Sequence, residues 1–136
     1  MNVEQNKSIA LRYIEEMHNK RNLDVADELF SDECKIHLGQ ASFNSENYKN
    51  IILRSSSTFS DITTTVDDLI AEGDKVVTRW TSRFTHQDKF MGVDATYQQI
   101  KISGISIYRI NQSKIAEIWI SWDRLSLMQQ LGVIHP

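Results

Sequence analysis

Apolar side chains in the first third of the chain recur every four residues, which is the spacing of one helix face. This pattern predicts a helix over about residues 3–19, whose apolar face carries Ile9, Ala10, Tyr13, Ile14 and Met17. The same spacing at positions 25/29 and 26/30 predicts a short second helix. Asn44 or Ser45 can cap a third helix, because a short polar side chain satisfies the free amides of a first turn.

From residue 61 onward, alternating apolar and polar residues predict strands. We expect strands over residues 62–70, 75–86, 100–110 and 114–122, a shorter one over 34–38, and a last helix over 124–131. In 75–86 one face would carry Val76, Trp80, Phe84 and His86, and the other Val77, Arg79 and Arg83. The connection 87–99 would bend at Met91 and Gly92, and residues 111–113 predict a hairpin turn.

Helices followed by a run of antiparallel strands are typical of an α+β fold. The chain contains no repeat, linker-like stretch or break in composition, which predicts a single domain over residues 1–136. Helices cover only one face of such a sheet, and the last two strands carry apolar residues on both sides. We therefore expect a homodimer that pairs through the open face of the sheet.

Composition narrows the class of protein. A chain of 136 residues can bury a core, and its net charge is −3. The 15 Lys and Arg residues are scattered, which argues against a nucleic-acid partner. No signal peptide or apolar run of membrane-spanning length is found, so no membrane partner is expected. Cys34 is the only cysteine, which excludes an intrachain disulfide and favours the cytoplasm.

The segment 117–123 contains the strongest candidate for chemistry. On a strand, Glu117, Trp119, Ser121 and Asp123 share one face, and Asp123 then lies at a strand-to-helix junction near two indoles. A carboxylate between aromatic walls is poorly hydrated, which suits a general acid or base near neutral pH. Asp123 is equally suited to cap the last helix, and one residue can do both.

Histidines and aromatic residues supply the other candidates. His86 ends a strand in phase with Trp80 and could relay a proton or donate to a substrate carbonyl, although it could also anchor a loop. His37 could line a pocket, whereas His18 and His135 are expected to be exposed. The aromatic side chains are core residues unless a cavity exists, in which case they form its walls: Tyr13, Phe59, Trp80, Phe90 and Trp119.

Several chemistries lack their motifs. The chain has no Gly-x-Ser-x-Gly elbow and no Gly-rich phosphate loop, which excludes α/β-hydrolases and common nucleotide-binding folds. Cys34-x-x-His37 lacks a second pair of metal ligands, so no metal site is expected. Arg79 with Asp123 would suit water activation, but strand alternation turns Arg79 away from Trp80 and His86.

The second half of the chain resembles the SnoaL-like polyketide and ester cyclases of the nuclear-transport-factor-like superfamily. The resemblance rests on an ordered set of motifs: Val77-x-Arg79-Trp80, Thr85-His86, Phe90-Met91-Gly92, Ala95-Thr96, Gly104-Ile105, Lys114-Ile115, Trp119-x-x-x-Asp123 and Gln129-Gln130-Leu131-Gly132. The N-terminal helices match more loosely, through Asn22-x-Asp24 and Leu29-Phe30.

This resemblance implies a cone-shaped curved sheet that encloses a hydrophobic pocket with three N-terminal helices. It also implies that Asp123 removes an α-proton during aldol closure without cofactor or metal, and that His86 and His37 face the pocket. The chain departs from the family pattern at the pocket rim. Asp88 and Tyr97 stand where glycines are usual, and the proline that usually follows His37 is missing.

Three kinds of function fit this chain. The first is cofactor-free acid/base catalysis, an aldol cyclisation or isomerisation, on a hydrophobic carbonyl or ester compound. The second is non-catalytic binding of an apolar small molecule in the same pocket. The third is dimerisation with an incidental cavity. A water-activating, epoxide-hydrolase-like enzyme is a further alternative, because a shared fold can host many chemistries.

Overall fold

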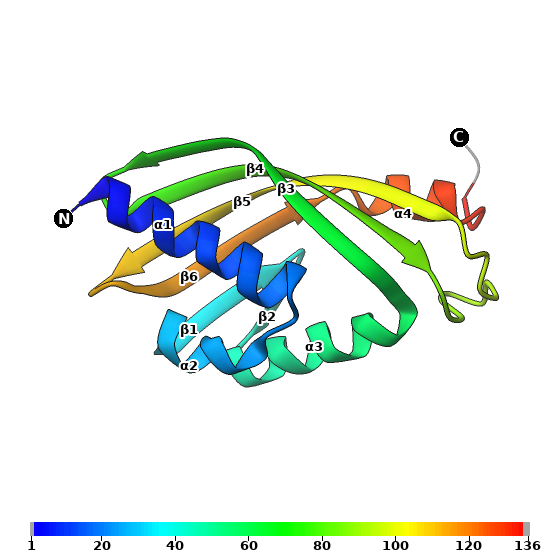
Figure 1. The fold of residues 1–136 in the computed structure, drawn as a ribbon, viewed down its shortest axis with the longest axis horizontal. Helices are drawn as coiled ribbons and strands as arrows, with labels where there is room; N and C mark the ends of the chain where they lie inside the picture. Colours follow the sequence, from blue (N-terminus) through cyan, green and yellow to red (C-terminus); the bar gives the residue numbers. More distant parts are fainter. Residues whose placement is uncertain (1, 135–136) are drawn as a thin grey trace.

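Six strands form one curved sheet in the computed structural model, which describes residues 2–134 (Figure 1). In chain order the elements are α1 (Val3–Tyr13), the π-helical segment η1 (Ile14–Asn19), the 3₁₀ turn η2 (Leu23–Val25), α2 (Ala26–Leu29), β1 (Phe30–Leu38), β2 (Ala41–Phe43), α3 (Ser45–Thr58), β3 (Phe59–Glu72), β4 (Lys75–His86), β5 (Gln99–Asn111), β6 (Lys114–Trp122) and α4 (Arg124–Gln130). The strands lie in the order β2-β1-β6-β5-β4-β3. Neighbouring strands are antiparallel except β1 and β6, which run parallel.

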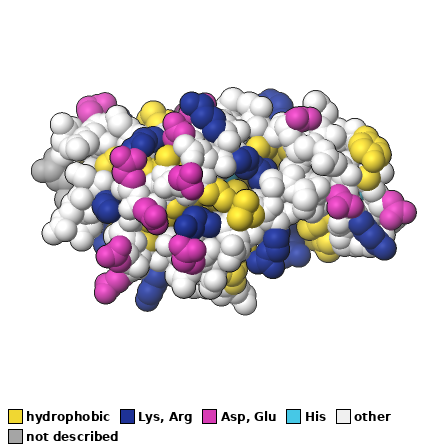
Figure 2. All heavy atoms as spheres, turned by 60° about the horizontal axis from the view of Figure 1, so that its bottom comes forward, with side chains coloured by type: hydrophobic (Ala, Val, Ile, Leu, Met, Phe, Trp, Pro, Cys, Tyr) yellow, Lys and Arg dark blue, Asp and Glu magenta, His cyan; other side chains and the backbone are white. Residues whose placement is uncertain are grey.

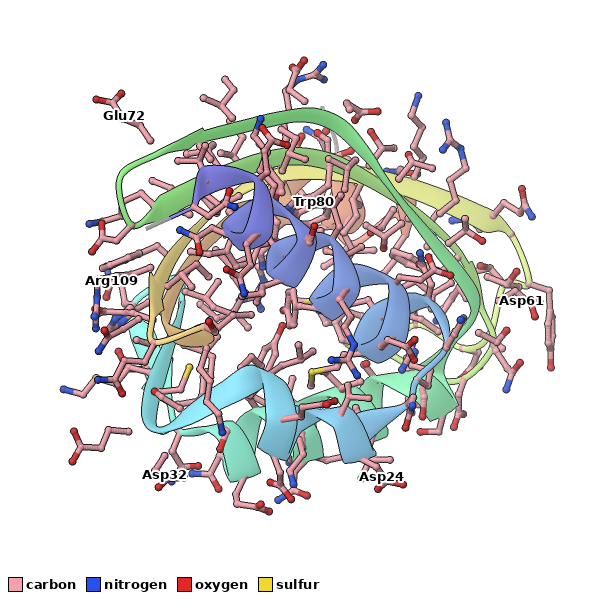
Figure 3. All side chains as sticks on the ribbon, turned by 60° about the vertical axis from the view of Figure 1, so that its left-hand side comes forward. Asp24, Asp32, Asp61, Glu72, Trp80 and Arg109 are labelled. Carbon is pink, nitrogen blue, oxygen red and sulfur yellow. The ribbon has the colours of Figure 1, made fainter. Side chains whose placement is uncertain are left out.

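The sheet arches over α1, α2 and α3, which lie on its concave side (Figures 1 and 3). The α+β fold expected from the order of helices and strands is therefore confirmed. Two features were not predicted: the parallel pairing of β1 with β6, and the short strand β2. Helical spacing at positions 26/30 suggested that Phe30 ends a helix, whereas α2 has only four residues and Phe30 begins β1.

Short polar side chains begin the long helices. Asn2 Oδ1 accepts hydrogen bonds from the backbone amides of Glu4 and Gln5 at the start of α1. Asn44 Oδ1 accepts from the amide of Asn47 at 2.8 Å, which makes Asn44 rather than Ser45 the cap of α3. Each cap satisfies amides that lack a partner within the helix and is worth about 1 kcal/mol.

Two tight turns occur where the sequence predicts them. Gln112 and Ser113 connect β5 to β6 with φ angles of 51° and 62°, the left-handed pair of a two-residue hairpin turn. Met91 and Gly92 have φ angles of 51° and 78°, and Phe90 and Val93 exchange two backbone hydrogen bonds across them. The second turn lets the connection between β4 and β5 fold back on itself.

Alternation along β4 determines which side chains face the helices. Val76, Phe84 and His86 are buried on the concave side, whereas Arg79 and Arg83 are exposed on the convex side, as the sequence predicts. Trp80 lies beneath the arch, while Arg109 and Glu72 lie on the outside of the molecule (Figure 3). The concave face of the sheet is therefore the wall against which the helices can enclose a space.

The buried apolar residues form two clusters rather than one. The larger cluster joins α1, η1, α2 and α3 to β1, β5 and β6, and it includes Met17, Ile36 and Ile118. The smaller cluster packs α4 against Phe84 and Ile100 at the other end of the sheet. Among the described residues, no helix is both long and apolar enough to cross a membrane.

Charged side chains of both signs are interspersed on the face nearest α2 and α3 (Figure 2). Ion pairs such as Lys7–Glu4 and Lys49–Glu46 link neighbouring turns of α1 and α3. At physiological ionic strength such mixed surface charges largely cancel beyond about 8 Å. Any electrostatic recognition on this side must therefore come from individual groups rather than from a field of one sign.

Candidate functional site: an enclosed apolar cavity

A cavity of about 350 Å³ lies between the helices and the concave face of the sheet. Most of its lining is aliphatic or aromatic, contributed by Ile14, Leu38, Ile51, Ile52, Phe59, Ile62, Trp80, Phe84, Phe90, Ile102, Ile120, Trp122 and Leu127. Residues of both apolar clusters contribute to it. The volume and the apolar wall are those of a pocket for a small organic ligand.

Three polar side chains form a hydrogen-bonded group in the cavity wall. The hydroxyl of Tyr13 lies 2.6 Å from the hydroxyl of Tyr48 and 2.7 Å from Nε2 of His18, and the Tyr48 hydroxyl lies 3.2 Å from the same nitrogen. Burial, reinforced by neighbouring tyrosines, raises the pKa of Tyr13, and burial likewise raises the pKa of Tyr48. Burial, with a smaller effect of Arg21, lowers the pKa of His18 to about 4. At neutral pH all three groups are therefore uncharged.

A π-helical segment brings His18 to Tyr13. In a regular α-helix, residues five positions apart lie on different faces, because a turn takes 3.6 residues. In η1 the turn is wider, and the imidazole of His18 packs edge-on against the Tyr13 ring with centroids 4.9 Å apart. We expected His18 to be exposed; instead it lines the cavity. His135, also expected to be exposed, lies outside the described residues.

Arg21 lines the same cavity directly after η1. Its Nη1 donates to the backbone carbonyl of Ile52 at 2.9 Å. Its backbone has a φ of 56°, the left-handed conformation that side-chain-bearing residues seldom adopt. Partial burial lowers the pKa of the guanidinium, and within residues 2–134 no carboxylate lies within 4 Å of it.

The polar atoms on the sheet side are paired with one another. Trp80 Nε1 donates to Ser106 Oγ at 3.0 Å, and the hydroxyls of Thr64 and Ser82 lie 2.6 Å apart. A Cβ atom on Gly104 would lie 2.3 Å from Cζ2 of Trp80 and 2.8 Å from the Ser121 carbonyl oxygen. The absence of a side chain at Gly104 therefore makes room for the Trp80 indole.

Four of the aromatic residues proposed from the sequence line the cavity: Tyr13, Phe59, Trp80 and Phe90. The other two proposed wall residues lie on the convex face. His37 Nε2 bonds Glu117 Oε2 at 2.6 Å, its Nδ1 bonds Ser42 Oγ at 2.8 Å, and its ring stacks on Trp119 with centroids 5.6 Å apart. Strand β6 turns Ile118 and Ile120 toward the helices, so Trp119 and its neighbour His37 face outward.

Asp123 caps α4, where its Oδ1 accepts a hydrogen bond from the Ser126 amide at 2.9 Å. The residue is exposed and does not itself line the cavity, although Trp122 and Leu127 on either side of it do. Trp119 and Trp122 point to opposite faces of the sheet. Asp123 therefore stands beside the edge of the cavity rather than between two indoles.

His86 is completely buried at the end of β4. Its Nδ1 lies 3.3 Å from the backbone nitrogen of Thr96, which donates to it, and 2.9 Å from Thr96 Oγ1. Because a backbone amide only donates, Nδ1 carries no proton, and we assign the ring proton to Nε2. Within the described part of the chain, Nε2 has no hydrogen-bond partner. The ring packs near Phe59, which lines the cavity, at a centroid distance of 5.9 Å. His86 itself does not line the cavity, so it lies behind the wall rather than facing the pocket as the resemblance implied.

The two residues that depart from the expected glycines lie in the exposed connection between β4 and β5. Tyr97 has a φ of 55°, the left-handed conformation for which glycine is best suited, and its amide donates to the His86 carbonyl. Its side chain is 71% exposed. Asp88 is exposed and uses Oδ1 to accept from the Lys89 amide. Neither side chain lines the cavity.

Metal ligands do not gather in the described part of the molecule. Within residues 2–134, no three His, Cys, Asp or Glu side chains come close enough together to hold a metal ion. Cys34, next to the His37 segment, is buried, and desolvation raises the pKa of its thiol to about 12.

Three solved structures from Streptomyces species share this architecture. AclR from Streptomyces galilaeus, described as a candidate hydroxylase, superimposes with a TM-score of 0.90 at 23% identity, over 99% of this chain and 85% of its own. TsrD from Streptomyces laurentii gives a TM-score of 0.86 at 25% identity, over 98% of this chain and 99% of its own. IdmH from Streptomyces antibioticus, described as a candidate polyketide cyclase, gives 0.82 at 29% identity, over 93% of this chain and 98% of its own.

Sequence comparison gives the family. Comparison with curated proteins finds no significant match. The family model of SnoaL-like polyketide cyclases matches residues 8–131, which span α1 to α4 and every cavity-lining residue. The chain belongs to the SnoaL-like polyketide cyclase family.

Proposed function

We propose that this protein is an enzyme that carries out cofactor-free acid/base chemistry on a hydrophobic carbonyl or ester compound. The reaction would be an intramolecular aldol cyclisation or an isomerisation, both of which begin with removal of an α-proton. The observation that carries the proposal is the uncharged polar group of Tyr13, Tyr48 and His18 in an otherwise apolar wall. A neutral hydroxyl in such surroundings stabilises the negative charge that develops on a carbonyl oxygen during enolisation.

Asp123 is the proposed base. It lies between two cavity-lining residues, and only Oδ1 takes part in the cap, so a carboxylate oxygen remains for a ligand that reaches this edge. His86 is the proposed neutral donor through Nε2–H, because the hydrogen bond from the Thr96 amide keeps its Nδ1 free of a proton. Since its ring is fully buried outside the cavity lining, this role requires the neighbouring Phe59 ring to move when a ligand binds.

Hydrogen–deuterium exchange tests the proposal without knowledge of the natural product. The protein is incubated with ethyl 3-oxooctanoate in D₂O, and loss of the C2 proton signal is followed by NMR. Catalysed enolisation makes this exchange faster than in buffer containing heat-denatured protein. Equal rates in the two samples, with binding of the ester verified by calorimetry, would remove the catalytic proposal.

Non-catalytic binding is the second candidate, and one observation favours it. Within residues 2–134, no Asp or Glu lines the cavity, and Asp123 is exposed outside it. A carrier needs the apolar wall and a hydrogen-bond donor but no base. Arg79 pairs with Asp68 at 2.6 Å on the convex face, so the water-activating alternative gains no support from this pair.

We also propose that the protein forms a homodimer through the convex face of the sheet. Ile105, Ile107 and Trp119 are 50%, 37% and 36% exposed there, on the two adjacent strands β5 and β6. Sedimentation at micromolar concentration should then give twice the chain mass of 15.7 kDa. Ile105→Asp should shift the protein to monomer, whereas Leu53→Asp, a charge added at an exposed leucine of α3, should not.

A further inference from the structure

One end of the cavity carries a formal charge. Among the described residues that line it, Arg21 is the only Arg, Lys, Asp or Glu. Its guanidinium has five N–H donors, and within residues 2–134 only Nη1 is engaged, with the Ile52 carbonyl. A partly buried cation without a counter-ion is unfavourable, because desolvation is not offset by a charge of opposite sign. Arg21 therefore lacks an anionic partner within the described chain.

Uncharged polar groups line the same cavity as Arg21. His18 is close enough to Arg21 for the guanidinium to lower its pKa, and Tyr13 and Tyr48 are hydrogen-bonded to His18. Tyr48 and Ile52, whose carbonyl holds Arg21, are one turn apart on α3. An oxygen anion at this end could accept from the guanidinium and from a tyrosine hydroxyl at once. No acidic side chain of the described lining would repel it.

Arg21 is held at the boundary between the cavity and solvent. The residue is only half-buried, and its left-handed backbone is unfavourable for a residue with a side chain. An ionised head group at this point keeps part of its hydration, while an attached apolar chain can lie against the cavity wall. The arrangement suits an amphiphilic ligand better than a wholly apolar one.

We propose that the cavity binds an apolar monocarboxylic acid, with its carboxylate paired to Arg21 and hydrogen-bonded by the Tyr13–Tyr48 hydroxyls, and its chain toward Phe84 and Leu127. The proposal rests on the proposed function insofar as it takes this cavity as the ligand site. It narrows the ligand from any hydrophobic carbonyl compound to one that also carries a free carboxylate.

Two probes of nearly equal length test the charge requirement. Binding of decanoate and of methyl decanoate is measured by isothermal titration calorimetry at pH 7.5. The wild-type protein should bind decanoate about 10-fold or more tightly than the ester, the usual worth of a charge-assisted hydrogen bond. Arg21→Met should abolish this preference, because methionine keeps the apolar stem and the same backbone strain. Arg54→Met, which removes an exposed arginine of α3, should preserve it.

The outcomes separate the two proposals. Equal or tighter binding of methyl decanoate by the wild-type protein overturns the carboxylate proposal and leaves the exchange assay as the test of catalysis. If Arg21→Met fails to fold, the comparison of decanoate and methyl decanoate in the wild-type protein still tests the carboxylate proposal. If folded Arg21→Met protein still binds decanoate more tightly than methyl decanoate, the carboxylate proposal is also overturned. Preferential binding of decanoate upholds the carboxylate proposal. If calorimetry shows that the keto ester also binds but its C2 proton is not exchanged, the catalytic role is removed while the carboxylate proposal stands. Binding of neither probe overturns the carboxylate proposal together with the cavity as an apolar ligand site.

A second readout reports where the carboxylate sits. The His18 ring is followed by NMR as pH is changed, with and without saturating decanoate. A bound carboxylate beside the ring should raise the pKa of His18 from about 4 by about one unit or more, because an opposite charge favours the protonated form. Methyl decanoate should leave it unchanged. An unchanged titration with decanoate bound would place the carboxylate elsewhere and overturn the assignment to Arg21.

Discussion

The hydroxyl oxygens of Tyr13 in α1 and Tyr48 in α3 lie 2.6 Å apart, although the two residues are separated by 35 positions in the chain. Both rings are almost completely buried. This contact joins two helices inside the cavity and is also the part of the wall that can stabilise a developing oxyanion. Stability and the proposed chemistry therefore share the same pair of atoms.

Tyr48→Phe separates these two contributions. It removes one hydroxyl and leaves Tyr13 with its bond to His18, so the free energy of unfolding should fall by only about 1 kcal/mol. Exchange of ethyl 3-oxooctanoate should fall by about 10²-fold if the hydroxyl stabilises the enolate. Tyr97→Phe, in an exposed loop residue, is the matched control and should change neither quantity. Full exchange activity in Tyr48→Phe would exclude this hydroxyl from the reaction.

Substitutions of Asp123 distinguish a base from a cap. Asp123→Asn retains a capping oxygen but cannot take a proton, so thermal stability should change little while exchange falls by about 10²-fold. Asp123→Ala removes both functions and should in addition cost about 1 kcal/mol of stability. Thermal denaturation and the exchange assay measure the two effects on the same samples. Unaltered exchange in Asp123→Asn would leave Asp123 as a cap alone.

The depressed pKa of His18 predicts that acid destabilises the protein. The unfolded chain binds a proton at His18 below about pH 6.5, whereas the folded protein binds it only below about pH 4. Between these values the unfolded state holds more protons, so the free energy of unfolding falls as pH falls. Allowing for partial exposure, His18 should account for about 1–2 kcal/mol of the loss between pH 7.5 and pH 5.

Urea denaturation at the two pH values measures this contribution. His18→Asn lacks the titrating ring but keeps the carboxylates of the wild-type protein, so it should lose less stability between pH 7.5 and pH 5. An identical loss in the two proteins would show that the ring of His18 titrates normally in the folded state.

Gly104→Ala should damage the sheet side of the cavity. The added methyl group would overlap the Trp80 ring and the Ser121 carbonyl, so one strand or the indole must move. Overpacking of this kind costs about 1–3 kcal/mol. A displaced Trp80 should also lose its bond to Ser106, which a shift in tryptophan fluorescence would report. Gly73→Ala, at an open turn with a φ of 59°, should leave that fluorescence unchanged. A protein of wild-type stability and fluorescence would contradict the predicted overlap at Gly104.

Much of the cavity could be predicted because its walls follow regular periodicity. The alternation in β4 correctly placed Trp80 and Phe84 on one face, opposite Arg79, and helical spacing placed Tyr13 on the apolar face of α1. Both patterns have one polar face, so the apolar face can only point inward.

The positions of the other site residues could not be predicted from the sequence, and each failure has a physical reason. Strand β6 is apolar on both faces, so alternation placed Trp119 and Asp123 in phase but could not say which face is concave. His18 reaches the cavity through a π-helical turn, which a spacing of 3.6 residues does not anticipate. Arg21, just after this π-helical segment, has a left-handed backbone conformation that is usually associated with glycine. The sequence therefore did not indicate that the Arg21 side chain lines the cavity.

The parallel pairing of β1 with β6 also constrains how the molecule is made. His37 and Glu117 are hydrogen-bonded across this pair although 80 residues separate them. Contacts of such sequence separation form slowly, because a long loop must close before any of them is gained. During synthesis, the N-terminal elements leave the ribosome well before β6, namely α1, α2, α3 and β1. Until β6 emerges, their apolar faces remain exposed to solvent. We therefore expect the nascent chain to be most prone to aggregation before its last strand emerges, and the β5–β6 hairpin to complete the cavity wall when it pairs with β1 and β4.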